Sequence, residues 1–178
     1  MRYLKIIYLL YTINFLFSDK ILIPMDLEQA DHLKAYGIVY WSLEKDQKVD
    51  WLLNYRGGSF LIDNYPTIQS ECLVRGVTFE IIDANSFANI LALIEQNNMD
   101  IALLETPPKI AVYSPPGKQP WDDAVTLALT YAEVNYDVIF DDEVLSGSIR
   151  KYDWLHLHHE DFTGQYGKFY KNYRNHAW

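Results

Sequence analysis

The densest group of side chains able to do chemistry in this chain lies in "KYDWLHLHHEDFTGQYGKFY", residues 151–170. Three histidines and two acids fall within the six positions from His156 to Asp161. Imidazole and carboxylate groups at this spacing could bind a metal ion, act as a general acid or base, or cap a helix. The residue types alone leave these three roles open.

The alternation of side chains along a strand helps to choose among these three roles. It would put His156 and His158 on one face of the strand and His159 on the other. Two histidines on one face could share a zinc ion, but zinc needs a further protein ligand. The side chains available for that place are Glu160, Asp161 and Asp142. We predict no metal site, and the candidates for a general acid or base are His158, His159 and Glu160.

Two further polar clusters could bind a small molecule. Arg56 stands before a Gly-Gly pair, and its guanidinium and the neighbouring backbone N–H groups could hold an anion, although a plain turn explains the same residues. Trp121 precedes two acids and could hold a sugar or an amide, although acids also suit the first turn of a helix. The candidate ligand-binding residues are Asn54, Tyr55, Arg56, Trp121, Asp122, Asp123 and His156.

The elements that must position these clusters follow from the apolar pattern. "KILIPM" and "KVDWLLNY" are continuous apolar runs, which are typical of strands covered on both faces. Between them, residues 30–41 have apolar side chains at helical spacing, and Asp26 with Gln29 predicts a cap at the start of this helix. A strand, a helix and a second strand in this order favour a parallel crossover.

The same alternation continues along the chain. Pro66 and Gly76 predict the two ends of a helix, and Ser86 predicts the start of another. "ETPPK" is the clearest break, so we predict a first half at residues 19–105 and a second half at 106–178. In the second half, strands are expected at 109–115, 136–145 and 151–161, with a helix at 121–134. This pattern predicts an α/β fold, flavodoxin-like, with a mostly parallel sheet and helices on both faces.

The polar clusters all follow predicted strands directly. In an open parallel sheet, ligands bind beyond the carboxyl ends of the strands. We therefore expect the clusters to meet at one common edge and to form a pocket for a polar small molecule or a glycan. The last helix has no strand after it, so a short sheet would leave an apolar edge unpaired. The partner expected at this edge is a missing C-terminal half of the same chain, so the fold is expected to be incomplete at the C-terminus.

Composition limits the classes of partner. The 178 residues are 49% hydrophobic and 15% aromatic, which indicates a packed core rather than disorder. The net charge is −9 and no basic cluster interrupts it, so nucleic acid is not an expected partner. The lone Cys72 permits no intramolecular disulfide and is expected to be a buried thiol. No P-loop is present, and no cofactor is predicted.

Residues 1–18 have the pattern of a secretory signal peptide. Arg2 and Lys5 precede an apolar run that continues from Ile6 to Phe17. This run is shorter than the roughly 20 residues that a membrane-spanning helix needs. We therefore predict export to the periplasm or cell envelope, with no membrane span beyond the signal segment.

Four stretches of the mature part are distinctive: "LIPMD", "VDWLLNYRGGSFL", "QPWDDAVTLALTYAEVNYDVIFDDEVL" and "KYDWLHLHHEDFTGQYGKFY". In these stretches the chain resembles a family of exported bacterial proteins, longer than this one, that are commonly labelled asparagine synthetase B. The resemblance runs from Lys20 to Trp178 and implies that this chain is an amino-terminal portion. The second half also resembles the opening strands of class I glutamine amidotransferase-like domains, which implies an amidotransferase-like fold.

The family label implies glutamine-hydrolysing asparagine synthesis, but the residues for that reaction are absent. No cysteine follows Met1, and there is no Ser-Gly-Gly-x-Asp-Ser loop for ATP. Cys72 also lacks the Gly-x-Cys-x-Gly context of a class I nucleophile, so no catalytic residue of these families is carried over. The expected function is an amidotransferase-like or hydrolase domain acting on an amide or a sugar, with the enzyme class open. The alternative is a non-catalytic cell-envelope module that binds glycan or protein.

Overall fold

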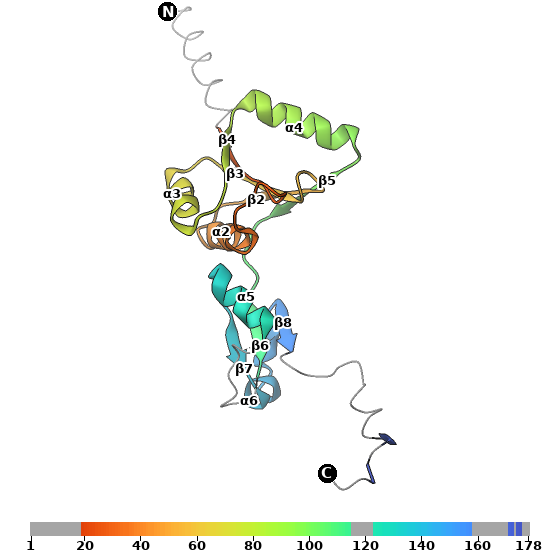
Figure 1. Cartoon of the computed structure of the whole chain (residues 1–178). Helices are drawn as coiled ribbons and strands as arrows, with labels where there is room; N and C mark the ends of the chain where they lie inside the picture. The colour runs from red at the N-terminus through yellow and green to blue at the C-terminus, as the bar shows by residue number, and fades with distance from the viewer. Residues whose placement is uncertain (1–18, 115–122, 158–170, 173, 176–178) are drawn as a thin grey trace, which may run out of the picture. The chain divides into compact units, whose positions relative to one another are not determined.

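The computed structural model describes residues 19–114, 123–157, 171–172 and 174–175 (Figure 1). The chain divides into two compact units. The first holds the residues up to Pro107 together with 131–134, and the second holds 108–130 and the residues from Asn135 on. The predicted signal segment, residues 1–18, lies outside the described residues. Among the helices that the structure describes, none is both long and apolar enough to cross a membrane.

The first unit alternates strands and helices. Its elements are β1 (Lys20–Ile23), α2 (His32–Glu44), β2 (Val49–Leu53), β3 (Ser59–Asp63), α3 (Pro66–Arg75), β4 (Glu80–Ile82), α4 (Ala84–Gln96) and β5 (Asp100–Leu104). The strand order is β4-β1-β3-β2-β5, and every neighbouring pair is antiparallel. From β1 to β4 this is the split βαβ arrangement of ferredoxin-like domains, and β5 extends the sheet beside β2.

The mostly parallel sheet predicted for this half is therefore wrong. β1 and β2 do run parallel to each other, but β3 lies between them and is antiparallel to both. β3 is the return strand of a hairpin, in which Leu52 pairs with Ser59 and residues 54–58 form the turn. The apolar runs correctly indicated strands with both faces covered, but coverage says nothing about the direction of a neighbouring strand.

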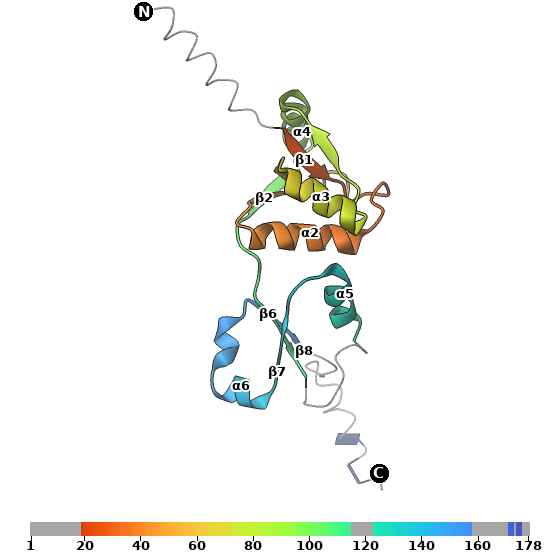
Figure 2. The same ribbon diagram turned by 90° about the vertical axis from the view of Figure 1, so that its left-hand side faces the viewer.

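Helices cover both faces of this sheet, as predicted (Figures 1 and 2). Alternate residues of each strand enter two separate apolar clusters. One face packs with α2 and α3 in a cluster that includes Ile21, Ile23, Ile38, Phe60, Ile68 and Cys72. The other face packs with α4 in a cluster that includes Leu22, Leu52, Leu61, Ile90 and Ile94. The sheet is thus the middle layer of three.

Two predicted helix starts lie elsewhere. The N-cap of α2 is Asp31, whose side chain accepts a backbone N–H of the first turn, and not Asp26. The N-cap of α4 is Asp83, and Ser86, predicted as the cap, donates its backbone N–H to Asp83 at 2.8 Å. Either residue of each pair could cap a helix, so the choice depends on where the preceding strand ends. α3 has the ends that Pro66 and the following glycine predict.

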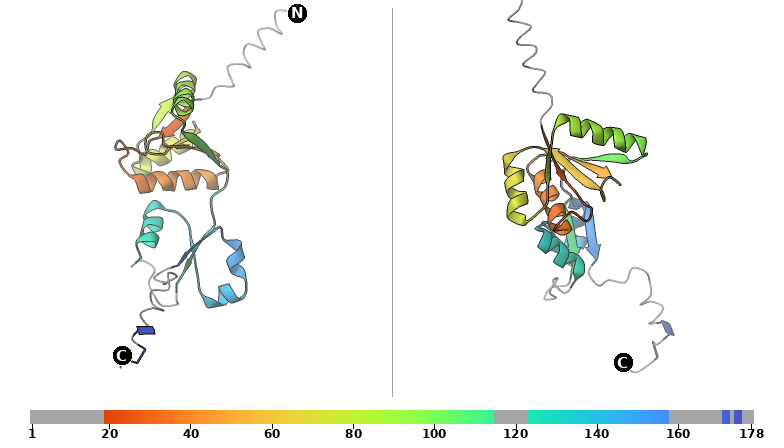
Figure 3. Two further views of the ribbon diagram at one scale, coloured as in Figure 1. Left: turned by 90° about the vertical axis from the view of Figure 1, so that its right-hand side faces the viewer. Right: turned by 45° about the horizontal axis from the view of Figure 1, so that its top comes forward.

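The second unit contains a parallel sheet, as predicted for this half. Its elements are β6 (Ile110–Tyr113), α5 (Ala124–Ala132), β7 (Asp137–Ile139), α6 (Asp141–Leu145), the 3₁₀ helix η3 (Ser148–Lys151) and β8 (Trp154–Leu157). The strand order is β7-β6-β8, and both pairs are parallel. Figures 2 and 3 show α5 and α6 on opposite sides of the strands.

The strand predicted at 136–145 is too long. It ends at Ile139, and α6 follows directly. The acids Asp141, Asp142 and Glu143 form the first turn of α6, where carboxylates are favoured, and Glu143 accepts the backbone N–H of Phe140 at 2.9 Å. The strand predicted at 151–161 likewise begins later, because η3 occupies its first residue.

Candidate functional site

The strand order of the second unit creates a switch point at the central strand β6. From β6 the chain passes through α5 to β7 on one side, and then through α6 and η3 to β8 on the other side. Ligands of open α/β sheets bind at the carboxyl ends of the strands, at the point where the order reverses in this way. The carboxyl ends of β6 and β8 are therefore the place to look for a site.

On the α5 face of the sheet, a histidine is held by a carboxylate. His156 pairs with Val112 of β6 in the parallel register, and its Nε2 lies 3.0 Å from Oδ1 of Asp123. Asp123 directly precedes α5, and the same oxygen accepts the backbone N–H of Val125 at 2.7 Å and of Thr126 at 3.2 Å. Asp123 is thus both the N-cap of α5 and the partner of His156.

These hydrogen bonds favour one tautomer of the neutral imidazole. Oδ1 of Asp123 accepts two backbone N–H groups, so the carboxylate acts as the acceptor toward His156 as well. His156 then donates through Nε2–H, and in the neutral ring Nδ1 is left as an acceptor. The side chains are 18% and 11% exposed, so the pair is largely shielded from water.

Ser114 is a second polar group on this face. It follows β6 directly, and its backbone N–H donates to the carbonyl of Ile139 at 3.0 Å, which continues the ladder between β6 and β7. Alternation along β6 places its side chain on the face of Val112 and His156. The residue is 2% exposed, and its hydroxyl has no hydrogen-bond partner among the residues that the structure describes.

Sequence reasoning missed Ser114. The signal was present, because a lone serine stood at the carboxyl end of a predicted strand, directly before Pro115. Buried hydroxyl groups are nearly always hydrogen-bonded, so an unpaired one at a switch point suits a polar ligand.

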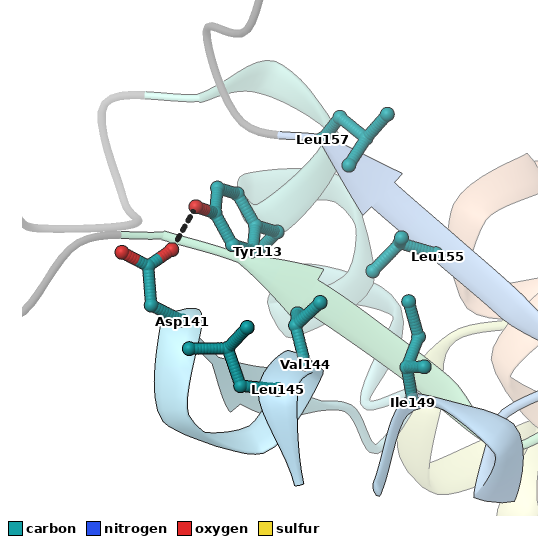
Figure 4. Close-up of a pocket in the computed structure, with 7 residues that line it drawn as sticks. All are labelled: Tyr113, Asp141, Val144, Leu145, Ile149, Leu155 and Leu157. Atoms are coloured by element: carbon teal, nitrogen blue, oxygen red, sulfur yellow. Dashed lines mark hydrogen bonds between the residues drawn. The ribbon is translucent and has the colours of Figure 1, made fainter. Parts of the chain in front are cut away.

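The α6 face of the same sheet carries a cavity of about 490 Å³ (Figure 4). It is lined by Tyr113, Asp141, Val144, Leu145, Ile149, Leu155 and Leu157. The Tyr113 hydroxyl donates to Oδ1 of Asp141 at 2.6 Å, as the dashed line in Figure 4 shows. Leu155 and Leu157 line this cavity while His156 bonds to Asp123, so residues 155–157 alternate between the two faces of the sheet, and the predicted faces of His158 and His159 lie outside the described residues.

Five of the predicted site residues lie outside the described part of the chain. They are Trp121, Asp122, His158, His159 and Glu160. Of the remaining predicted residues, the structure brings Asp123 and His156 together.

The other predicted residues lie in the β2–β3 hairpin of the first unit. The guanidinium of Arg56 donates to three carboxylates, from Nε to Asp26 at 2.8 Å, from Nη1 to Glu80 at 2.7 Å and from Nη2 to Glu28 at 2.7 Å. The hydrogen bond to Asp26 is the largest cause that raises the pKa of Arg56, and it lowers the pKa of Asp26. Three acids around one guanidinium disfavour a bound anion, so this geometry favours a structural role for Arg56.

The two neighbours of Arg56 also serve the hairpin. Asn54 has a φ of 65°, a left-handed conformation that asparagine tolerates better than most residues. Tyr55 packs against the apolar cluster that contains Leu52 and Leu61. The turn that the sequence left as an alternative is therefore what the structure shows for residues 54–58.

The expectation of one common edge is wrong. Residues 54–56 follow a strand of the antiparallel sheet, whereas Asp123 and His156 belong with the parallel sheet. Two sheets replace the single one on which that expectation depended. The candidate site is therefore defined by residues of the second unit alone.

Metal and thiol chemistry find little support in the described residues. Within them, no group of three or more His, Cys, Asp or Glu side chains could hold a metal ion. Cys72 is fully buried, and this burial raises the pKa of its thiol to about 12. A buried thiol of this kind is a poor nucleophile.

Comparisons with known proteins do not identify a family. No family model matches the chain, and no curated protein matches it. A solved structure, formyltetrahydrofolate deformylase from Pseudomonas putida KT2440, is similar at 17% identity with a TM-score of 0.21. The match covers 88% of this chain and 55% of the deformylase, so the chain spans about half the length of that protein.

These findings correct the resemblance drawn from the sequence. The likeness to proteins labelled asparagine synthetase B, and to class I glutamine amidotransferase-like domains, is not supported. The solved structure that was found is a different enzyme, and its similarity is too weak to carry an argument about this chain.

Proposed function

We propose that the second unit binds a small polar molecule, an amide or a sugar, at the carboxyl ends of β6 and β8, and that His156 acts there as a general base. The observation that carries this proposal is the hydrogen bond between His156 and Asp123 at the switch point of the sheet. The buried hydroxyl of Ser114 supports it, because that group has no partner among the described residues and can both donate and accept.

The geometry suits hydrolysis. Asp123 is fixed by two backbone N–H groups and holds the imidazole through Nε2. Nδ1 could then take a proton from a water molecule while the water oxygen attacks the carbonyl carbon of an amide. The imidazole would afterwards return that proton to the leaving nitrogen. This arrangement of a base oriented by a carboxylate is the part of a catalytic triad that fixes the tautomer.

A test uses the full chain with a panel of amino-acid amides and glycan fragments. Release of ammonia would report hydrolysis, and calorimetry would report binding. His156→Gln should lower turnover by about 10²–10⁴-fold, the usual contribution of a general base. His32→Gln is the matched control, because His32 lies in the first unit and should leave turnover unchanged.

Two outcomes would contradict this function. Binding without hydrolysis would favour the non-catalytic alternative, a module for glycan or protein. Equal turnover in His156→Gln and the unchanged protein would show that the pair with Asp123 serves only to tie β8 to α5.

We also propose that the protein is exported. The support is the cationic and apolar pattern of residues 1–18. Expression of the full chain in a bacterial host and sequencing of the mature N-terminus would check this. Removal of the first 18 residues is the expected result, and an intact N-terminus in the cytoplasmic fraction would contradict it.

A further inference from the structure

The cavity on the α6 face is separate from the proposed site on the α5 face. Among the residues that the structure describes, aliphatic side chains from α6, η3 and β8 form its walls, and Tyr113 and Asp141 form its polar end (Figure 4). Leu145 on the wall is 84% exposed, so a ligand here would remove apolar surface from water. The volume of about 490 Å³ falls within the range of small-molecule sites.

The polar end of the cavity offers hydrogen-bond acceptors. The hydroxyl hydrogen of Tyr113 is already donated to Oδ1 of Asp141, so it is not available to a ligand. The second carboxylate oxygen of Asp141 is an acceptor. A ligand that fits this end must therefore bring N–H or O–H donors.

The charge around the cavity distinguishes a cationic N–H donor from a neutral hydroxyl donor. Asp141 is followed by Asp142 and Glu143, and none of the described residues that line the cavity is cationic. The ring of Tyr113 also lines the cavity, and an aromatic ring beside a carboxylate attracts ammonium groups. Both features favour a cation over a neutral hydroxyl compound.

We infer that this cavity binds a hydrophobic amine. The ammonium group would donate to Asp141 beside the ring of Tyr113, and the alkyl or aryl part would lie against Leu145, Leu155 and Leu157. The inference does not depend on the function proposed for His156, because the two sets of residues lie on opposite faces of the sheet.

The test compares three probes of similar shape on the full chain by calorimetry. They are 2-phenylethylamine, the neutral 2-phenylethanol and the anionic 3-phenylpropanoate. We expect the amine to bind about tenfold more tightly than the alcohol, the difference made by one charge-assisted hydrogen bond, and the acid not to bind. The advantage of the amine should shrink as salt is added.

Matched variants assign the effect to the cavity. Asp141→Asn should abolish the preference for the amine over the alcohol, and Asp142→Asn should preserve it. Both remove one charge from the same helical turn, but only Asp141 lines the cavity. His156→Gln should also leave amine binding unchanged, which keeps this test distinct from that of the proposed function.

Three results would overturn the inference. They are absence of amine binding at millimolar concentration, equal binding of amine and alcohol, and equal losses in Asp141→Asn and Asp142→Asn. Circular dichroism of each variant would show that the fold is retained, so that a loss can be assigned to the side chain.

Discussion

The two units of this protein differ in the hydrogen bonding of their buried serine hydroxyls. In the first unit the hydroxyls of Ser42 and Ser59 donate to the backbone carbonyls of Ile38 and Arg56. In the second unit the buried hydroxyl of Ser114 has no partner among the described residues. A bonded hydroxyl stabilises the fold around it, whereas one without a partner can bind a ligand.

The two sheets also differ in how their faces are packed. The sheet of the first unit has apolar clusters on both faces, formed with α2 and α3 on one side and α4 on the other. The parallel sheet of the second unit has a cavity between β8 and α6. On the proposed function, the first unit provides stability and the second unit provides the binding site.

The largest effect is expected from the core of the first unit. Phe60 is 2% exposed and its ring packs against those of Trp51 and Tyr36, with centroids 5.9 and 5.6 Å away. Phe60→Ala should lower the free energy of unfolding by about 3–5 kcal/mol, measured by urea denaturation. Leu27→Ala at a fully exposed position is the control and should change it by less than about 0.5 kcal/mol. A small loss in Phe60→Ala would contradict the description of this unit as closely packed.

A smaller effect is expected at Asp123, where two roles can be separated. Asp123→Ala removes the cap of α5 and should lower the free energy of unfolding by about 1–2 kcal/mol. Asp123→Ser restores a capping oxygen and should recover most of that stability. It does not restore the carboxylate that holds His156, so turnover should remain low.

The pair of variants therefore distinguishes capping from catalysis. Thermal unfolding would report the first role, and the amide assay would report the second. If Asp123→Ser recovers both stability and turnover, the carboxylate has no part in catalysis. Asp123 would then serve only the stability of the second unit.

The Arg56 cluster should contribute stability that depends on pH. The hydrogen bond from Arg56 lowers the pKa of Asp26 below its ordinary value of 3.8. A carboxyl group with a lowered folded pKa adds stability above the unfolded pKa, and this contribution is lost as the pH falls through the folded pKa. Arg56→Met should therefore be less stable than the unchanged protein at neutral pH, with a difference that shrinks as the pH falls below 3.8.

Urea denaturation between pH 7 and pH 3 would measure this difference. Arg150→Met removes the same charge from an exposed position in the second unit and should show a much weaker pH dependence. A constant difference between the unchanged protein and Arg56→Met would show that Asp26 contributes no pH-dependent stability through Arg56.

The sequence predicted elements better than their pairing. Helix α3, strands β1 and β2, and the parallel character of the second unit follow from local patterns that a single stretch contains. The antiparallel sheet does not, because it depends on β3 returning between β1 and β2. That return is caused by the hairpin at residues 54–58, where Asn54, Arg56 and two glycines have positive φ. The Gly-Gly pair suggested a turn, but not which strand would receive the chain.

The site shows the same limit. His156 and Asp123 were both candidates, yet their contact spans two elements and could not be read from either. The role expected for Arg56 failed for a related reason, since Asp26, Glu28 and Glu80 reach it from other segments. Residue types predict what chemistry a side chain can do, and tertiary contacts decide whether it is free to do it.

The smallest effect is expected at Cys72, the nucleophilic group buried in the first unit. Burial raises the pKa of its thiol to about 12, so at pH 8 the reactive thiolate is nearly absent. The native protein should resist an aromatic disulfide reagent at that pH, and the protein in urea should react with one thiol per chain. Rapid labelling of the native protein would mean that the first unit opens readily. The first unit could then not be described as the more stable of the two.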